Sequence, residues 1–187
     1  MNNPLVFIVD TVFDVVSFLF LARLILQASR ADFYNPISQG IVKATDPILR
    51  PMRIVIPGYR NIDFAAFIAA WLIKVLAYTL SLGIQSQFMP GALSLFAIGL
   101  YDVLRLLLTV YWFALIIVIV LSFLAPGSYH PAAALLSQVT EPILAPARRL
   151  IPPLGGLDFS PILVFMILIL IRDYLLKAIF ATLLTLT

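Results

Sequence analysis

Four long stretches of this chain are almost entirely apolar, and each has the length of a membrane-crossing helix. They lie near residues 5–26, 64–82, 101–123 and 161–184. A helix that rises about 1.5 Å per residue needs about 20 apolar residues to cross the hydrocarbon core of a bilayer. Of the 187 residues, 63% are hydrophobic and 11% are charged, which is too little charge to cover the surface of a soluble domain. The sequence therefore predicts an all-α membrane protein with four transmembrane helices.

Two of these stretches need a separate interpretation. The first contains Asp10 and Asp14 and follows no Lys or Arg, whereas a cleavable signal peptide has a basic start and an uncharged core. We therefore expect a span that is retained. The third apolar stretch runs from Leu93 to Ala125, which is too long for one upright crossing. We expect a short interfacial helix there, followed by the crossing near 101–123.

The second half of the sequence repeats the first half at one fixed offset and without a gap. The matched pairs are Tyr34 with Tyr129, Pro36 with Pro131, Thr45 with Thr140, Asp46 with Glu141, Pro47 with Pro142, Pro51 with Pro146, Arg53 with Arg148, Pro57 with Pro152 and Asp63 with Asp158. Prolines at identical spacing over such a length indicate an internal duplication. We predict two repeats, residues 1–90 and 91–187, each made of a span, a proline-rich linker and a second span. Because each unit crosses twice, the two repeats are expected to be parallel.

Basic residues are concentrated in the two proline-rich linkers. They are Arg30, Lys43, Arg50, Arg53 and Arg60 in the first linker, and Arg148 and Arg149 in the second. The segment before the first span and the loop between the repeats hold no Lys or Arg. By the positive-inside rule, both linkers are expected to face the cytoplasm and both termini the opposite side.

Each linker begins with the pattern of a helix N-terminus. Asn35 precedes Pro36 as a helix cap precedes a first-turn proline, and His130 precedes Pro131 in the same way, although histidine is a less favourable cap. His130 has an alternative interpretation as a haem or metal ligand, but a lone histidine before a proline is more often a cap or an interface residue.

A second helix start is predicted further along each linker, where an acidic residue precedes a proline. Beyond it, apolar residues share one helical face, and Pro51 and Pro146 predict a kink or a helix start. We expect short amphipathic helices in the membrane interface, with arginines at anionic headgroups. The candidate interfacial motif comprises Pro36, Thr45, Asp46, Pro47, Arg50, Pro51, Arg53, Pro57, Pro131, Thr140, Glu141, Pro142, Pro146, Arg148, Arg149 and Pro152. It either anchors the linkers or presents a surface to a partner.

Several ionisable residues lie inside the predicted spans, where they are costly and suggest function. They are Asp10, Asp14, Lys74, Asp102, Arg105, Arg172, Asp173 and Lys177. Counted from the outer ends, Asp14 and Arg172 reach the same depth, as do Asp10 and Lys177. We therefore expect an ion-paired cluster in the outer half of the bundle, with Asp14 paired to Arg172. The cluster serves either packing between the repeats or transport.

Other span residues have structural interpretations. Arg23 is expected to snorkel to the cytoplasmic interface. The four alanines at 65, 66, 69 and 70 are spaced for close helix approach. Tyr111 and Trp112 are too deep for an interfacial belt and are interpreted as packing residues.

The sequence carries no enzyme signature. It has no cysteine and one histidine, which excludes disulfides, thiolate metal sites and His-rich metal centres. It shows no phosphate-binding glycine loop and no nucleophile beside a base. We predict no enzymatic activity and no cofactor. The basic linkers are short and lack interleaved aromatic residues, so direct binding of nucleic acid is not expected.

The repeated pattern Thr-acid-Pro-Ile-Leu-x-Pro-x-Arg, followed by Ile-Pro and by Asp-Phe at the next span, resembles the YggT family of bacterial integral membrane proteins, also called YlmG-type. The resemblance covers residues 5 to 184. It implies two copies of a two-span unit, as in the two-copy form found in proteobacterial inner membranes. The second copy departs from the first by having Ala145 in place of Arg50, so the halves need not bind equally.

The resemblance implies roles in tolerance of osmotic or ionic stress and in the organisation of division, nucleoid and envelope. Plastid relatives are implicated in assembly of a b-type cytochrome with covalently attached haem. The resemblance also implies the bacterial inner membrane, so with the orientation from the positive-inside rule we expect a multi-pass protein with periplasmic termini and cytoplasmic linkers. No catalytic residue of this chain can be assigned from the resemblance.

Three hypotheses for function follow. The leading one is a non-enzymatic scaffold or assembly factor whose linker helices contact anionic lipid headgroups and membrane-protein partners or further copies of the chain. The alternative is an oligomeric conduit, or a transport regulator, for ions or small osmolytes that uses the intramembrane charges. The third is a haem-handling enzyme or chaperone.

Overall fold

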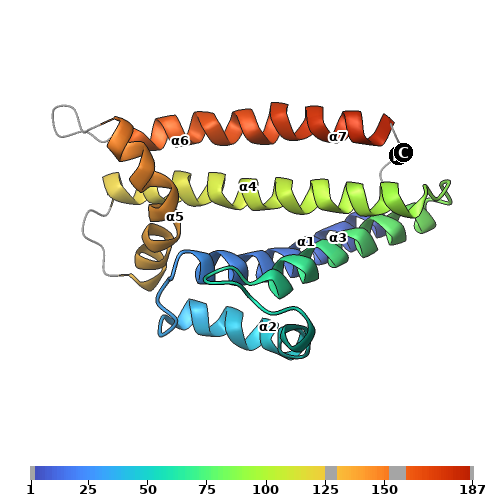
Figure 1. The fold of residues 1–187 in the computed structure, drawn as a ribbon, viewed down its shortest axis with the longest axis horizontal. Helices are drawn as coiled ribbons and strands as arrows, with labels where there is room; N and C mark the ends of the chain where they lie inside the picture. The colour runs from blue at the N-terminus through green and yellow to red at the C-terminus, as the bar shows by residue number, and fades with distance from the viewer. Residues whose placement is uncertain (1–2, 125–129, 152–158, 186–187) are drawn as a thin grey trace.

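Figure 1 shows the computed structural model of the chain as long helices side by side, with shorter helices crossing or flanking them. It describes residues 3–124, 130–151 and 159–185. The elements are α1 (Pro4–Ala28), α2 (Pro36–Val55), α3 (Phe64–Ile84), α4 (Ala92–Leu124), α5 (Pro131–Leu150), α6 (Ser160–Ile169), η1 (Leu170–Leu175) and α7 (Leu176–Thr185). Within these ranges the chain forms helices and no strand, only an isolated bridge between Tyr59 and Ile62. The predicted all-α class is confirmed.

Helices α1 and α3 pack closely and run antiparallel. The four alanines predicted to allow this approach are all buried, at Ala65, Ala66, Ala69 and Ala70. They form a core with Phe20 and Leu21 of α1. The backbones are close enough for the Ser17 hydroxyl to donate to the Ala70 carbonyl oxygen at 3.4 Å. The prediction that the alanines of α3 allow a neighbouring helix to approach closely is therefore confirmed.

Helix α4 packs on α3 and is continuous. The prediction of a separate interfacial helix before residue 101 is wrong, because α4 runs without a break from Ala92. Gly99 lies against α3, where an added Cβ would meet the Val75 backbone nitrogen at 3.1 Å and its Cα at 3.3 Å. Among the residues that the structure describes, three helices are apolar and long enough to cross a membrane, namely α1, α3 and residues 92–121 of α4.

The chain is helical without a break from Ser160 to Thr185, although it is divided into α6, η1 and α7. The central turn, η1, is a π-helix, a rare form that often marks functional positions. Helix α7 packs on α4 through Leu176 and Phe180, which cluster with Ala97. This segment covers the residues of the fourth predicted span, which stays a prediction because none of its three helices is among the candidate spans in the described residues.

The linker helices α2 and α5 begin as predicted. The Asn35 side chain accepts from the Ile37 amide at 2.9 Å, and Nδ1 of His130 accepts from the Ala132 amide at 3.2 Å, each just before a first-turn proline. His130 is therefore a helix cap.

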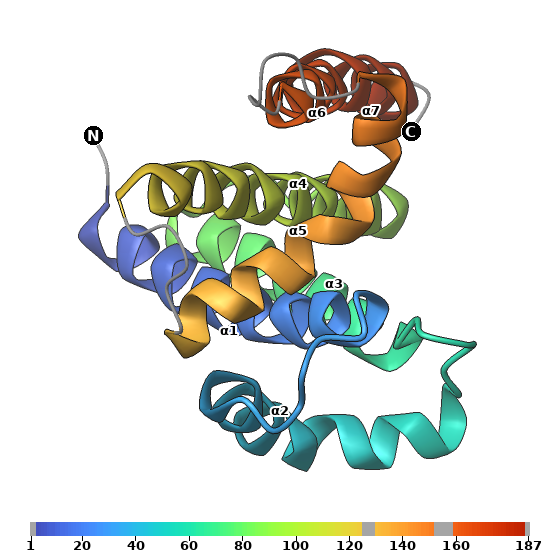
Figure 2. The same cartoon turned by 90° about the vertical axis from the view of Figure 1, so that its left-hand side faces the viewer.

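The predicted second helix starts are wrong, because α2 continues through Pro47 and Pro51, and α5 through Pro142 and Pro146. Both helices change direction along their length, as Figure 2 shows. A proline removes one backbone hydrogen bond and clashes with the preceding turn, so it bends the helix. The alternative of a kink at Pro51 and Pro146 fits this shape.

Both linker helices pack onto the long helices through buried leucines. Leu49 of α2 is buried in the core formed by α1 and α3. Leu144 of α5 is buried with Leu115 of α4 and Val164 of α6. The first half of α5 also packs on the end of α1, where Leu135 is buried in a cluster with Ile25 and Leu26. The linkers are therefore integral parts of the bundle.

We predict that Gly99→Ala destabilises the fold, because the new methyl group must displace α3. The expected loss is about 1–3 kcal/mol, the usual cost of overpacking a filled core. Thermal unfolding in detergent micelles measures it. The matched control is Gly40→Ala, since nothing lies within 4 Å of an added Cβ there. Alanine favours a helix over glycine by about 0.5–1 kcal/mol, so the control should unfold no earlier than the parent. Equal stability of the two variants would contradict the close α3–α4 contact.

Candidate functional site

The cap of α2 and the segment just before it are joined to α5 by hydrogen bonds. Nδ2 of Asn35 donates to the Pro131 carbonyl oxygen at 2.8 Å, and the Asp32 amide donates to Oε1 of Gln138 at 2.8 Å. These bonds connect residues about half the chain apart in sequence. They make one connected surface, called here the linker surface, from the described residues of α2 and α5 and the segment 29–35.

Two threonines of the predicted motif are buried at matching places in this surface. Thr45 and Thr140 are 1% and 0% exposed. Each hydroxyl donates to the carbonyl oxygen four residues earlier, Thr45 to Ile41 at 2.7 Å and Thr140 to Leu136 at 2.9 Å. Such bonds satisfy a buried hydroxyl and favour bending of a helix. The threonines therefore shape the helices and are not available to a ligand.

The acidic and basic motif residues of α2 pair within the fold. The Asp46 carboxylate accepts from Nε of Arg50 at 3.1 Å and lies 3.6 Å from Nη1 of Arg53. Nη2 of Arg53 also contacts Asp63 at 2.5 Å. Asp63 is buried and caps α3 by accepting from the Ala66 amide at 3.2 Å. Arg53 therefore fastens the end of α2 to the start of α3, which sequence reasoning missed although Asp63 is repeated at Asp158.

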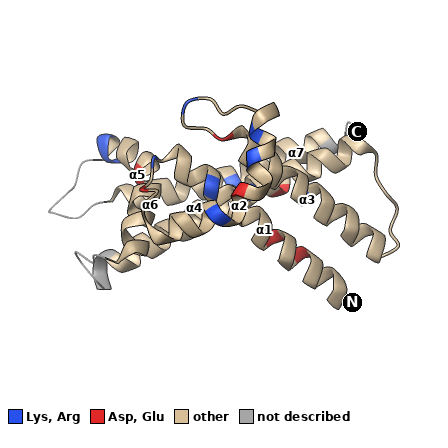
Figure 3. Ribbon diagram, turned by 90° about the horizontal axis from the view of Figure 1, so that it is seen from below, with Lys and Arg blue, Asp and Glu red and all other residues tan. Residues whose placement is uncertain are grey.

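In the second linker, Arg148 donates to both carboxylate oxygens of Glu141 at 2.8 Å. Arg149 is exposed beside it. The predicted motif residue Pro152 and the repeat position Asp158 lie outside the described residues. Figure 3 shows the basic residues concentrated on and around α2 and α5, while the acidic residues of α1 lie towards its N-terminus.

Arg23 departs from its expected position. It is 8% exposed, so it does not snorkel to the surface. Its guanidinium lies over the Phe33 ring, 5.2 Å from the centroid, and 3.9 Å from Asp46. Arg23 is therefore held inside the junction of α1 and α2.

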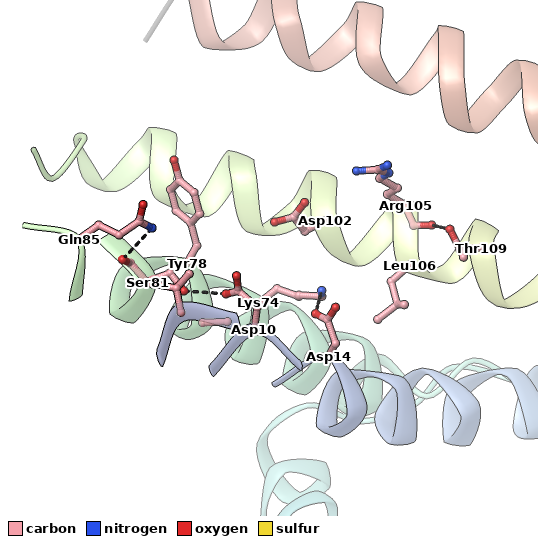
Figure 4. Close-up of a pocket in the computed structure, with 12 residues that line it drawn as sticks. Asp10, Asp14, Lys74, Tyr78, Ser81, Gln85, Asp102, Arg105, Leu106 and Thr109 are labelled. Atoms are coloured by element: carbon pink, nitrogen blue, oxygen red, sulfur yellow. Dashed lines mark hydrogen bonds and ion pairs between the residues drawn. The ribbon is translucent and has the colours of Figure 1, made fainter. Parts of the chain in front are cut away.

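At the other end of the bundle, five predicted charges line one cavity between α1, α3 and α4. The cavity has a volume of about 450 Å³. Its ionisable residues are Asp10, Asp14, Lys74, Asp102 and Arg105. Figure 4 shows them with Tyr78, Ser81, Gln85 and Thr109, polar residues that sequence reasoning missed. Ser81 lies two helical turns after Lys74, so the same face of α3 could have indicated it.

The pairing within this cavity differs from the expectation. Asp14 forms an ion pair with Lys74 of α3, so its expected pairing with Arg172 is wrong. Asp10 accepts from the Ser81 hydroxyl at 2.6 Å. Asp102 has no hydrogen-bond or ion-pair partner within the part of the chain that the structure describes. Arg105 is directed away from Asp14 in Figure 4.

The remaining predicted charges lie outside the cavity. Arg172 pairs with its neighbour Asp173, at 2.8 Å between Nη2 and Oδ2, both within the π-helical turn. The guanidinium of Arg172 also lies over the Trp112 ring, 5.5 Å from its centroid, which fits the packing role expected for Trp112. Lys177 is exposed on α7. The expected single cluster is therefore divided in two.

Comparison with known proteins gives two matches to one family model. The model described as CCB3/YggT matches residues 2–85 and 97–179. An uncharacterised protein of Pseudomonas aeruginosa is 45% identical over 172 residues, covering 91% of this chain and 87% of that protein. The uncharacterised protein YggT of Escherichia coli is 33% identical over 171 residues, covering 91% and 88%. An uncharacterised protein of Vibrio alginolyticus is 38% identical over 167 residues, covering 87% and 88%. No solved structure matches the chain significantly.

We predict that Asp14 and Lys74 are energetically coupled, whereas Asp14 and Arg172 are not. Asp14→Asn leaves the Lys74 ammonium unpaired, so replacing Lys74 by Gln should cost less in that background. We expect a coupling energy of about 1–2 kcal/mol for Asp14 with Lys74 in a double-mutant cycle. Thermal unfolding in nanodiscs measures it. The control cycle of Asp14→Asn with Arg172→Gln should be additive. Additive effects for Lys74, or coupling to Arg172, would contradict this pairing.

Proposed function

The chain belongs to the CCB3/YggT family, and we propose that it is a non-enzymatic scaffold or assembly factor of the bacterial inner membrane. In this proposal the linker surface faces the cytoplasm and holds membrane-protein partners or a second copy of the chain. The segment from Ser160 to Thr185 serves as the fourth span, and both termini are periplasmic. A link to tolerance of osmotic or ionic stress follows from the family resemblance.

The observation that carries this proposal is the joining of α2 to α5. Two separate anchors would need no bond between them, yet Asn35, the cap of α2, and Asp32, just before it, are both hydrogen-bonded to α5. A joined surface has a fixed shape, and a fixed shape lowers the entropy cost of binding a partner. Exposed apolar residues at the helix ends support a contact role, because Ile54 is 85% exposed and Leu150 is 75% exposed.

We predict that photo-crosslinking residues placed at Ile54 and at Leu150 capture the same membrane protein in cells. Arg149→Gln should lower the yield at both positions if one partner spans the surface. Asn35→Asp is the sharper variant, because its carboxylate keeps the cap on α2 but cannot donate to Pro131. It should lower both yields, whereas Asp14→Asn in the distant cavity should leave them unchanged.

A crosslinking residue at Leu5, at the opposite end of α1, is the positional control and should capture a different set of proteins or none. Capture of unrelated proteins from Ile54 and Leu150, or yields unaffected by Asn35→Asp, would count against a joined scaffold surface.

A second candidate function is favoured by the charged cavity. Asp102 lines a polar cavity and forms no hydrogen bond or ion pair among the described residues, which is costly in a membrane span and therefore suggests use. The function would be that of a conduit or transport regulator for ions or small osmolytes, acting as an oligomer.

For this second function, we predict ion flux in proteoliposomes that Asp102→Asn reduces and that Lys177→Gln, outside the cavity, does not. Asp102→Asn keeps the size of the side chain and removes its charge, so a loss of flux would report on charge alone. Flux no greater than that of protein-free liposomes would remove this candidate and leave the linker surface as the working site.

A further inference from the structure

The guanidinium of Arg23 has too few partners for its position. It is 8% exposed, and its Nε and Nη1 atoms are buried without a hydrogen-bond acceptor among the described residues. A buried charged group that lacks acceptors loses its hydration without compensation. Of the nearby carboxylates, Asp46 lies 3.9 Å from Nη2 of Arg23, beyond hydrogen-bond distance. The site therefore lacks an acceptor.

A cavity opens beside this group, between the end of α1 and α2. Its volume is about 480 Å³. It is lined by Arg23, Lys43, Arg50 and Asp46, together with Phe33, Gln39, Val42 and Pro47. The space is large enough for a phosphate group with part of its substituent, since a small-molecule site commonly measures about 300–1,000 Å³.

The charges around this cavity favour an anion. Arg23, Lys43 and Arg50 contribute three positive charges, and Asp46 contributes the only negative charge among the lining residues. Arg53 does not add to this excess, because the Asp63 carboxylate neutralises its positive charge. One of the two Asp46 oxygens, Oδ1, also has no hydrogen-bond donor. Its other oxygen, Oδ2, is bonded to Arg50, so the carboxylate offsets one of the three positive charges and leaves an excess of positive charge.

We propose that this cavity binds the phosphate group of an anionic phospholipid of the phosphatidylglycerol class. A guanidinium matches a phosphate through paired N–H donors, and Lys adds a compact charge. A lipid is the expected source, because Arg23 lies at the end of a span while Phe33, Val42 and Pro47 provide an apolar wall for the glycerol and upper acyl region. The ordinary attraction of basic residues to headgroups needs no buried arginine, so this site is more specific.

This inference goes beyond the proposed scaffold function. A lipid at this site would fasten α2 to α1 whether or not a protein binds the linker surface. Loss of crosslinking partners would leave the lipid site intact, and loss of the lipid site would leave the bonds between α2 and α5.

The test measures thermal unfolding and retained lipid in nanodiscs. The purified full-length protein is placed in nanodiscs of dioleoyl-phosphatidylcholine, with or without dioleoyl-phosphatidylglycerol, and retained phosphatidylglycerol is counted by native mass spectrometry. A third set contains phosphatidylcholine with inorganic phosphate. The variants are Arg23→Met, which keeps much of the side-chain length without charge, and Lys43→Gln on the exposed side of the cavity. Arg60→Gln, an exposed arginine outside the cavity, is the matched control.

We expect phosphatidylglycerol to raise the unfolding temperature of the parent and of Arg60→Gln. In Lys43→Gln, binding should weaken about tenfold, the usual effect of losing one charge-assisted contact. Arg23→Met should lose the response to phosphatidylglycerol, yet unfold in phosphatidylcholine no earlier than the parent, because it removes a buried charge that lacks acceptors. If Arg23 only stabilised the fold, Arg23→Met would unfold earlier than the parent in both lipids. Loss of the phosphatidylglycerol response without loss of stability in phosphatidylcholine therefore indicates lipid binding.

Equal stabilisation of the parent and both cavity variants by phosphatidylglycerol would overturn the proposal, since it would report only a general surface-charge effect. An unchanged count of retained lipid in Arg23→Met and Lys43→Gln would overturn it as well. If inorganic phosphate alone reproduces the pattern, the phosphate site stands and the lipid is excluded as its source.

Discussion

Close packing of α1 on α3 is the contact on which the rest of the structure depends. Lipid is as apolar as the helices, so their association depends on close van der Waals contact and on small residues. The alanine face of α3 allows that contact. It also fixes the antiparallel register, because the alignment that places Ser17 against Ala70 places Asp14 beside Lys74 and Asp10 beside Ser81. The apolar contact thus determines which charges pair.

The linker helices depend on the same bundle. A helix with two internal prolines has lost backbone hydrogen bonds and would not persist alone in water. Leu49 and Leu144 compensate by burying apolar surface against separate pairs of long helices. Arg53 then connects α2 to α3 through Asp63. These contacts turn two proline-rich segments into a surface of defined shape, which is the property that a scaffold needs and a loose tether lacks.

The two ends of the bundle differ in chemistry, and this difference separates the candidate functions. The basic end has more positive than negative groups around Arg23, so it attracts anions. The cavity at the other end holds three carboxylates with one lysine and one arginine, so it favours cations or polar solutes. Anionic lipid bound beside Arg23, as proposed, would fasten α2 to α1.

The sequence by itself determined the all-α class, the caps at Asn35 and His130 and the small-residue face of α3, because each depends on local pattern or composition. It misassigned Asp14 to Arg172 because equal depth in a membrane does not specify which helices are neighbours. Only the tertiary structure placed Lys74 beside Asp14, buried Arg23 and joined α2 to α5. These features depend on how helices distant in the sequence pack against one another, and helical periodicity carries no information about that.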